Sequence, residues 1–141
     1  MTLEGLRVTV TGGTGSLGHR LVARLLSGEM GEPECVTVFS RDEAKQHEMR
    51  LAYQKLPDAT DDATYGSVGK RLRFVIGDVR NYASVAAMLQ GTDVVFNAAA
   101  LKQVPTCEYF PFEAVQTNVC GPQNIVRAIQ ENDLRVKVVV G

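Results

Sequence analysis

The sequence predicts an α/β domain built on a doubly wound parallel sheet. Short β-branched or apolar runs alternate with segments of helical periodicity along the 141 residues. Parallel strands need a crossover between them, and because such crossovers are right-handed, the alternation places helices on both faces of the sheet. A glycine-rich turn between the first run and the first helical segment supports the same fold. The length predicts one domain over residues 1–141.

The composition excludes several classes of protein. Fifteen Lys and Arg residues balance sixteen Asp and Glu residues, which leaves a net charge of −1 and argues against a nucleic-acid partner. No apolar run approaches the ~20 residues that span a bilayer, so no membrane partner is expected. The opening MTLEGLRVTV lacks the pattern of a secretory signal, which favours the cytoplasm. Two histidines and three scattered cysteines predict no metal site.

The first predicted unit is a strand, a turn and a helix. Residues 7–11 (RVTVT) are β-branched and end at Gly12, which is typical of a buried strand running into a turn. From Ser16 the apolar residues recur at helical spacing, and Ser27 and Gly28 form a usual helix end.

The alternation continues through the middle of the chain. Residues 36–39 (VTVF) predict a second strand, and the segment from 42 to about 54 is rich in helix formers. A third strand is expected at 72–76, followed by a helix through residues 85–89. The polar segment at about 57–70 has no clear period and is expected to be a surface insertion.

The last third predicts two strands and a long helix. The fourth strand is expected at 93–97 and is followed by an irregular stretch that contains Pro105 and Pro111. A helix over about 112–131 and a fifth strand at 136–140 complete the chain. A domain rarely stops directly after a strand, so we expect the sheet to be truncated there.

The run TGGTGSLG predicts a dinucleotide site. Gly12 permits a tight turn, Gly15 lets the backbone approach a pyrophosphate, and Gly18 lets the helix pack close to the strand. The N–H groups and the positive dipole end of the following helix then face the anion. A glycine-rich turn that binds nothing is the alternative interpretation.

The end of the second strand favours NADP over NAD. An acidic residue there would bind the ribose hydroxyls of NAD, but Ser40 and Arg41 stand in its place. A hydroxyl and a guanidinium suit a ribose 2′-phosphate, and Lys45 adds positive charge one helical turn later. Asp42 follows directly, and its carboxylate either opposes this preference or caps the helix that begins there. Alternatively, Arg41 is an ordinary solvated charge.

The ends of the third and fourth strands carry further candidates. Asp78 and Val79 can meet an adenine, although Asp78 can equally cap the next helix. Ala98, Ala99 and Ala100 leave room for a flat ligand, although packing against a helix also favours alanine. Doubly wound folds bind ligands at the carboxyl ends of their strands, which favours the ligand for the alanines.

Several longer strings resemble one enzyme family. SRDEAKQHEM, IGDVR, AAALKQVPTCEYFPFEAVQTN and VVVG, together with the glycine turn, resemble the inverting nucleotide-sugar 4,6-dehydratases, typified by UDP-N-acetylglucosamine 4,6-dehydratase. This family belongs to the extended short-chain dehydrogenase/reductases. The resemblance covers nearly the whole chain and implies a Rossmann fold, NADP as cofactor and a UDP-sugar substrate. It also implies a homo-oligomeric full-length enzyme of surface polysaccharide biosynthesis.

The resemblance further implies a reaction and a set of contacts. The sugar would be oxidised at C4, lose its C5 proton and water from C6, and take hydride back at C6, which gives a 4-keto-6-deoxy product inverted at C5. By the resemblance, residues 14–17 would hold the pyrophosphate of the cofactor, residues 40–45 its adenosine phosphate, and Asp78 and Val79 its adenine. Ala98 would contact the ribose on the nicotinamide side, and Thr117 would lie near the inner wall. The expected cofactor residues are Gly12, Thr14, Gly15, Ser16, Leu17, Gly18, Ser40, Arg41, Asp42, Lys45, Asp78, Val79, Ala98, Ala99, Ala100 and Thr117, and the expected substrate residue is Lys102.

The catalytic pair of the superfamily is missing from this sequence. A Tyr-x-x-x-Lys turn supplies the base in such enzymes, but the four tyrosines here are followed four residues later by Pro57, Gly69, Ala86 and Glu113. In family members this pair follows the fifth strand, so the resemblance implies that the chain is the amino-terminal part of such an enzyme and that no catalytic residue is expected in it. The rival interpretations are a nucleotide-sugar epimerase, another reductase of the superfamily, and a non-catalytic NADP sensor.

Overall fold

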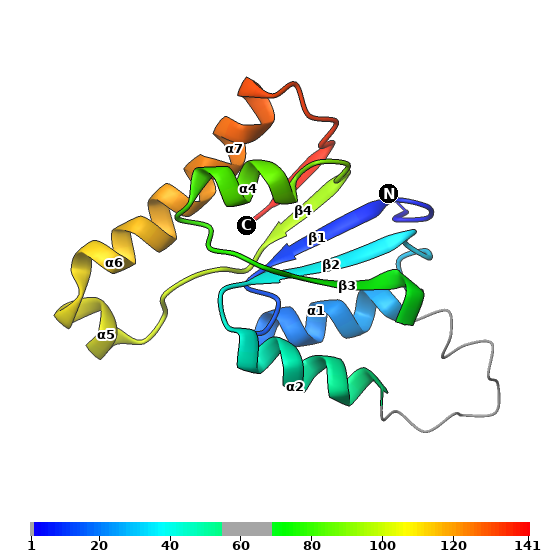
Figure 1. Cartoon of the computed structure of the whole chain (residues 1–141), viewed down its shortest axis with the longest axis horizontal. Helices are drawn as coiled ribbons and strands as arrows, with labels where there is room; N and C mark the ends of the chain where they lie inside the picture. The colour runs from blue at the N-terminus through cyan, green and yellow to red at the C-terminus, as the bar shows by residue number, and fades with distance from the viewer. Residues whose placement is uncertain (1, 55–68) are drawn as a thin grey trace.

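The fold is a single parallel sheet with helices on both faces (Figure 1). The computed structural model describes residues 2–54 and 69–141, so the insertion expected at 57–70 lies almost wholly outside the described residues. The strand order is β3-β2-β1-β4-β5, and every neighbouring pair is parallel. The strands are β1 Arg7–Thr11, β2 Cys35–Ser40, β3 Leu72–Ile76, β4 Val94–Asn97 and β5 Val138–Val140. Because the order runs outward from β1 in both directions, the predicted doubly wound parallel sheet is confirmed.

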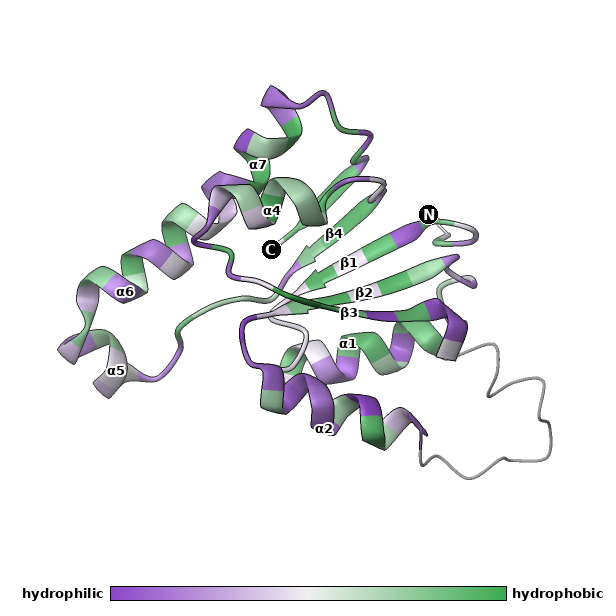
Figure 2. Cartoon of the chain, in the orientation of Figure 1, coloured by the Kyte–Doolittle hydropathy of each residue, from purple (hydrophilic) through white to green (hydrophobic). Residues whose placement is uncertain are grey.

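The helices divide between the two faces of the sheet (Figure 1). Helices α1 Ser16–Leu26 and α2 Glu43–Gln54 cover one face, and α4 Tyr82–Met88 and α7 Gly121–Glu131 cover the other. Figure 2 shows mostly apolar strands lying between these helices. In the part of the chain that the structure describes, no helix is long and apolar enough to cross a membrane.

Side chains alternate along the strands and form one buried cluster on each face. The cluster under α1 and α2 is built around Val8, Val10, Val22, Leu25, Val36, Val38, Met49 and Val94. The cluster under α4 and α7 is built around Phe39, Val79, Val85, Leu89, Val95, Ile125 and Ala128. The two clusters hold the carboxyl ends of the strands in a fixed arrangement, on which the site described below is built.

The segment after β4 is more helical than the sequence predicts. Helix α5 Val104–Tyr109 lies within the stretch expected to be irregular, so that expectation was wrong for these six residues, whereas residues 98–103 are irregular as predicted. Pro105 lies in the first turn of α5, where the missing N–H of proline breaks no helical hydrogen bond. The long helix expected over about 112–131 is present as α6 Pro111–Val115, a π-helical turn η1 Gln116–Cys120, and α7.

Strand β5 is shorter than predicted. It begins at Val138 because β4, its partner, begins at Val94, and these two residues are the first pair of the ladder. The expected strand residue Lys137 instead donates its backbone N–H to the Asp93 carbonyl at 2.7 Å, just outside the two strands.

Two glycines allow the turn after β1 to pack tightly. Gly12 has φ +63°, and a Cβ there would lie 2.7 Å from the backbone of Ala98 at the end of β4. A Cβ on Gly18 would lie 2.5 Å from the Gly12 carbonyl oxygen and from the Cα of Gly13. Gly18 therefore lets α1 pack against the turn after β1. The sequence predicts instead that Gly18 brings the helix close to the strand.

Adding a methyl group at Gly18 should destabilise the fold. Gly18→Ala gains about 1 kcal/mol in helix propensity but meets two backbone atoms that cannot move independently. We expect a net loss of roughly 1–3 kcal/mol in the free energy of unfolding, measured by denaturant titration. Gly69→Ala is the control, because no described atom lies within 4 Å of a Cβ there. Equal stability of the two variants would contradict the tight packing of the turn.

Candidate functional site

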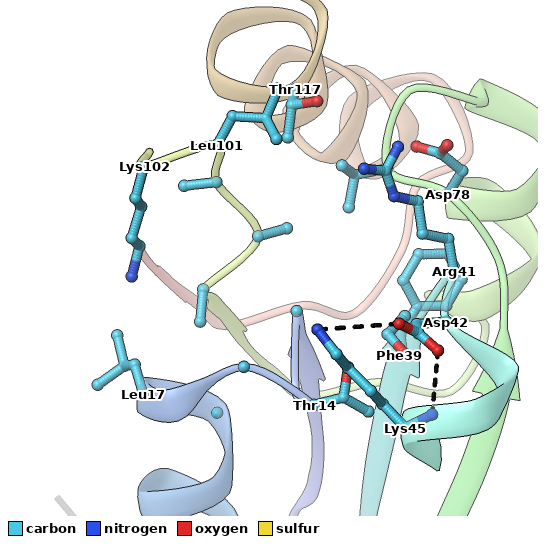
Figure 3. A pocket seen from close by; sticks show the side chains of 18 of the residues that line it. Thr14, Leu17, Phe39, Arg41, Asp42, Lys45, Asp78, Leu101, Lys102 and Thr117 are labelled. Carbon is cyan, nitrogen blue, oxygen red and sulfur yellow. Dashed lines mark hydrogen bonds and ion pairs between the residues drawn. The ribbon is translucent and has the colours of Figure 1, made fainter. Parts of the chain in front are cut away.

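A cavity of about 620 Å³ lies at the carboxyl ends of β1, β2, β3 and β4 (Figure 3). Every cofactor residue predicted from the sequence lines it, and so does Lys102. These residues therefore lie around one cavity, while contact of each residue with a ligand stays a prediction. The lining residues that the prediction omitted are Phe39, Gly77, Leu101, Gln103 and Thr106.

The omitted residues fall into two groups. Phe39 and Gly77 adjoin predicted residues at the ends of β2 and β3, so a rule that includes the flanking residues of each strand end would have found them. Leu101, Gln103 and Thr106 belong to the loop before α5 and to α5 itself, a segment of which only Lys102 was predicted, from the family resemblance, to lie at the site.

The amino terminus of α1 forms the base of the cavity. Gly15 is the N-cap residue, and it makes no side-chain hydrogen bond to the first turn. The first turn also contains no acidic residue, so no carboxylate competes for its N–H groups. The first N–H groups of a helix lack partners within the helix and lie at the positive end of its dipole. This arrangement is suited to bind an anion.

The end of β2 presents a buried serine. The Ser40 hydroxyl accepts a hydrogen bond of 3.0 Å from the Gln46 side-chain amide. The same amide nitrogen donates to the Ser40 carbonyl at 3.2 Å and to the Val75 carbonyl on β3 at 2.8 Å. Gln46 therefore orients Ser40 and joins the ends of β2 and β3, a role that its sequence position did not indicate.

Asp42 and Lys45 form a local pair at the start of α2. The Asp42 carboxylate accepts the Lys45 backbone N–H at 3.0 Å, so the predicted helix cap is confirmed. The Lys45 ammonium lies 3.8 Å from the other oxygen of the same carboxylate (Figure 3). Arg41, between them and β2, is exposed and makes no hydrogen bond or ion pair with the rest of the described chain. Figure 3 shows its guanidinium beside Asp78.

Asp78 is held by Arg80. Two side-chain nitrogens of Arg80 donate to its carboxylate, the closest contact being 2.6 Å from Nη2 to Oδ2, and the Arg80 backbone N–H donates at 2.9 Å. Burial alone would raise the pKa of Asp78, but the hydrogen bonds and charge of Arg80, aided by the charge of Arg41, bring it below its usual value. Asp78 does not cap α4, because Asn81 accepts the Ser84 N–H at 3.0 Å in that role.

The opposite wall is carried by the π-helical turn. Thr117 is 9% exposed, and its hydroxyl has no hydrogen-bond partner among the residues that the structure describes. The next residue, Asn118, pairs with the backbone of Leu101, accepting its N–H at 2.8 Å and donating to its carbonyl at 3.1 Å. Asn118 thereby fixes the loop that carries Lys102. Figure 3 shows Lys102 and Leu17 on one side of the cavity, away from Arg41 and Asp78.

The residues present fit a dinucleotide better than a metal ion. The turn at Gly12 leaves no space for a Cβ, helix α1 offers free donors, and Thr117 holds a buried hydroxyl that needs a partner. The cavity volume lies within the range of about 300–1,000 Å³ usual for small-molecule sites. Across residues 2–54 and 69–141, no group of three or more His, Cys, Asp or Glu residues is placed to hold a metal.

Known proteins resemble the chain over most of its length. UDP-glucose 4-epimerase of Rickettsia conorii is 45% identical over 132 residues, which is 93% of this chain and 34% of that protein. The corresponding protein of Rickettsia canadensis is 44% identical with the same coverage. The chain thus spans about a third of the length of these curated relatives.

Solved structures share the fold. The structure of Pen from Bacillus thuringiensis has a TM-score of 0.82 and 34% identity, covering 99% of this chain and 37% of that one. DesIV, a dTDP-glucose 4,6-dehydratase from Streptomyces venezuelae with NAD and TYD bound, has a TM-score of 0.66 and 28% identity, covering 92% of this chain and 37% of that one.

A family model provides the assignment. The model described as "Polysaccharide biosynthesis protein" matches residues 8–141, which is nearly the whole chain. The two Rickettsia relatives are named as UDP-glucose 4-epimerases and DesIV as a dTDP-glucose 4,6-dehydratase, in agreement with the predicted superfamily. On this evidence the chain belongs to the polysaccharide biosynthesis protein family.

Proposed function

We propose that this chain is the dinucleotide-binding part of an enzyme that acts on a nucleotide sugar. The observation that carries the proposal is the cavity at the strand ends. The uncapped amino terminus of α1 lies at its base, and Arg41 and Lys102 lie at its two opposite ends. The cavity lies where the strand order reverses between β1 and β4, which is where doubly wound sheets bind ligands.

Each wall of the cavity has a proposed task. The N–H groups of Ser16, Leu17 and Gly18 hold the pyrophosphate, with Thr14 and Gly15 beside them, and Asp78 and Val79 receive the adenine. Ala98, Ala99 and Ala100 leave space for the ribose and nicotinamide, and Thr117 supplies a hydroxyl from the inner wall. When bound, the nicotinamide supplies hydride transfer, and the protein supplies orientation.

The adenosine end favours NADP over NAD. Arg41 is exposed beside the cavity, and a planar guanidinium binds phosphate through two parallel hydrogen bonds. Ser40 adds a hydroxyl, while the Asp42 carboxylate is occupied by the first turn of α2 and by Lys45. DesIV, which shares 28% identity, was solved with NAD, so the preference is a property to be measured on this chain.

Two activities compete for the whole enzyme. The family strings around Lys102 favour a 4,6-dehydratase that acts on UDP-N-acetylglucosamine, and the likeness to DesIV supports a dehydratase. The 45% identity to a UDP-glucose 4-epimerase supports an epimerase. Both would place a UDP-sugar near Lys102, at the end of the cavity away from Arg41. A cytoplasmic location and a homo-oligomeric enzyme stay predictions.

Removing the Arg41 guanidinium should change cofactor preference. We expect Arg41→Ala to weaken NADP⁺ binding by about tenfold, the equivalent of one charge-assisted hydrogen bond, and to change NAD⁺ binding little. Calorimetric titration of both nucleotides measures this, with Arg135→Ala as the control at an exposed arginine outside the cavity. No heat with either nucleotide would overturn the proposed function, whereas a preference for NAD⁺ would overturn only the choice of NADP.

Thr117→Val should lower dinucleotide affinity without lowering the stability of the fold. The valine has nearly the same shape but removes a buried hydroxyl that has no partner in the described chain, so stability should be unchanged or raised. Dinucleotide affinity should fall roughly three- to tenfold, because one hydrogen bond to the ligand is lost. Thermal unfolding and calorimetry measure the two effects. A fall in stability with unchanged affinity would show that the hydroxyl has a purely structural role.

The chain alone should not complete the reaction. It lacks a Tyr-x-x-x-Lys pair, so the proton transfer at the sugar has no base of the expected kind. Incubation with NADP⁺ and UDP-N-acetylglucosamine or UDP-glucose, followed by NMR of the sugar, should show neither a 4-keto-6-deoxy product nor a C4 epimer. Either product would disprove this expectation and identify the activity directly.

A further inference from the structure

The Asp78 carboxylate lies beside two arginines, one from the loop after β2 and one from the loop after β3. Arg80, in the loop before α4, occupies both oxygens: its Nε lies 3.0 Å from Oδ1 and 2.9 Å from Oδ2, and its Nη2 lies 2.6 Å from Oδ2. Arg41, from the end of β2, lies beside the same carboxylate (Figure 3), and its charge acts on Asp78. Only Arg80 forms an ion pair with Asp78.

Arg80 is also fixed from behind. Its Nη1 donates to the Glu113 carboxylate on α6, whereas its Nε and Nη2 donate to Asp78. The Arg80 side chain is 26% exposed, and that of Asp78 is equally exposed, so the pair is partly shielded from water. Held by carboxylates on two elements, Arg80 cannot readily release Asp78.

The charges at this end are balanced. Arg41, Lys45 and Arg80 face Asp42, Asp78 and Glu113, which gives three positive and three negative groups. Asp42 pairs with Lys45, and Arg80 bridges Asp78 and Glu113, so Arg41 alone has no ion pair among the described residues. Without Arg80 the end would carry one net negative charge. Asp78 would then be free to pair with Arg41, whose guanidinium lies beside it. Arginine and carboxylate groups commonly pair through two parallel hydrogen bonds, which would occupy Arg41.

We propose that Arg80 is a specificity-determining residue of the adenosine end: by occupying Asp78, it keeps Arg41 available for a phosphate on the adenosine ribose. This inference rests on the proposed function. Arg80 does not touch the ligand itself. It acts by preventing capture of Arg41 and by cancelling a carboxylate charge that would repel the phosphate.

Two adenosine ligands that differ by one phosphate provide the test. The whole chain is titrated calorimetrically with adenosine 2′,5′-bisphosphate and with 5′-AMP, and the ratio of the two affinities is the readout. We expect Arg80→Met to lower the ratio by about tenfold, because one close charge pair is worth at least about that much. The double variant Arg80→Met with Asp78→Asn should return the ratio to near the wild-type value, since no carboxylate remains to capture Arg41.

Matched variants separate selectivity from structure. Arg80→Gln, which is neutral but retains hydrogen-bond donors, should lose the same selectivity and keeps the test decisive if Arg80→Met does not fold. Arg127→Met removes another arginine that pairs with a glutamate, on α7 outside the cavity, and should leave the ratio unchanged.

The possible outcomes distinguish the two proposals. Absence of binding of either ligand to the wild type would overturn the proposed function and this inference together. Binding of 5′-AMP without preference for the bisphosphate would overturn the inference and leave a nucleotide site. An equal loss of both affinities in the folded Arg80 variants, or a double variant as unselective as the single one, would assign Arg80 a structural role only.

Discussion

The handedness of the crossovers between parallel strands is the constraint on which the rest of this structure depends. Right-handed connections from β1 to β2 and from β3 to β4 run in opposite directions along the sheet, so their helices lie on opposite faces. At β1 and β4, where the direction reverses, the crossover helices lie on opposite faces and leave an opening at the carboxyl ends of the two strands. The cavity lies at this opening, and residues far apart in the sequence meet there because parallel strands end at the same edge.

Close packing of backbone at this opening makes the anion site possible. The turn at Gly12 lies against Ala98, and α1 lies against the turn at Gly18, with no space for a side chain at either position. The first N–H groups of α1 are thereby brought to the cavity rather than shielded by a capping side chain. On the other side, the Asn118 amide and the π-helical turn bring the Leu101 loop and Thr117 to the inner wall.

Electrostatics at the adenosine end follow from how each carboxylate is paired. Asp42 is bound by the first turn of its own helix, and Asp78 is bound by an arginine two residues later in the chain. Neither carboxylate is therefore free to neutralise Arg41, although both line the same cavity. An acidic side chain at the end of β2 does not by itself indicate NAD, because its hydrogen-bond partners decide whether a ligand meets its charge.

The sequence alone determined the strands, most of the helices, and the set of residues at the strand ends. Those features depend on local periodicity, on β-branched runs and on glycine spacing, as does the Asp42 cap, which spans only three residues. Tertiary structure alone decided α5, the contact of Asn118 with a loop 17 residues away, and the contact of Arg80 with a carboxylate 33 residues away. The physical reason is that such side chains find their partners only after the sheet has brought distant segments together, and no local pattern encodes that approach.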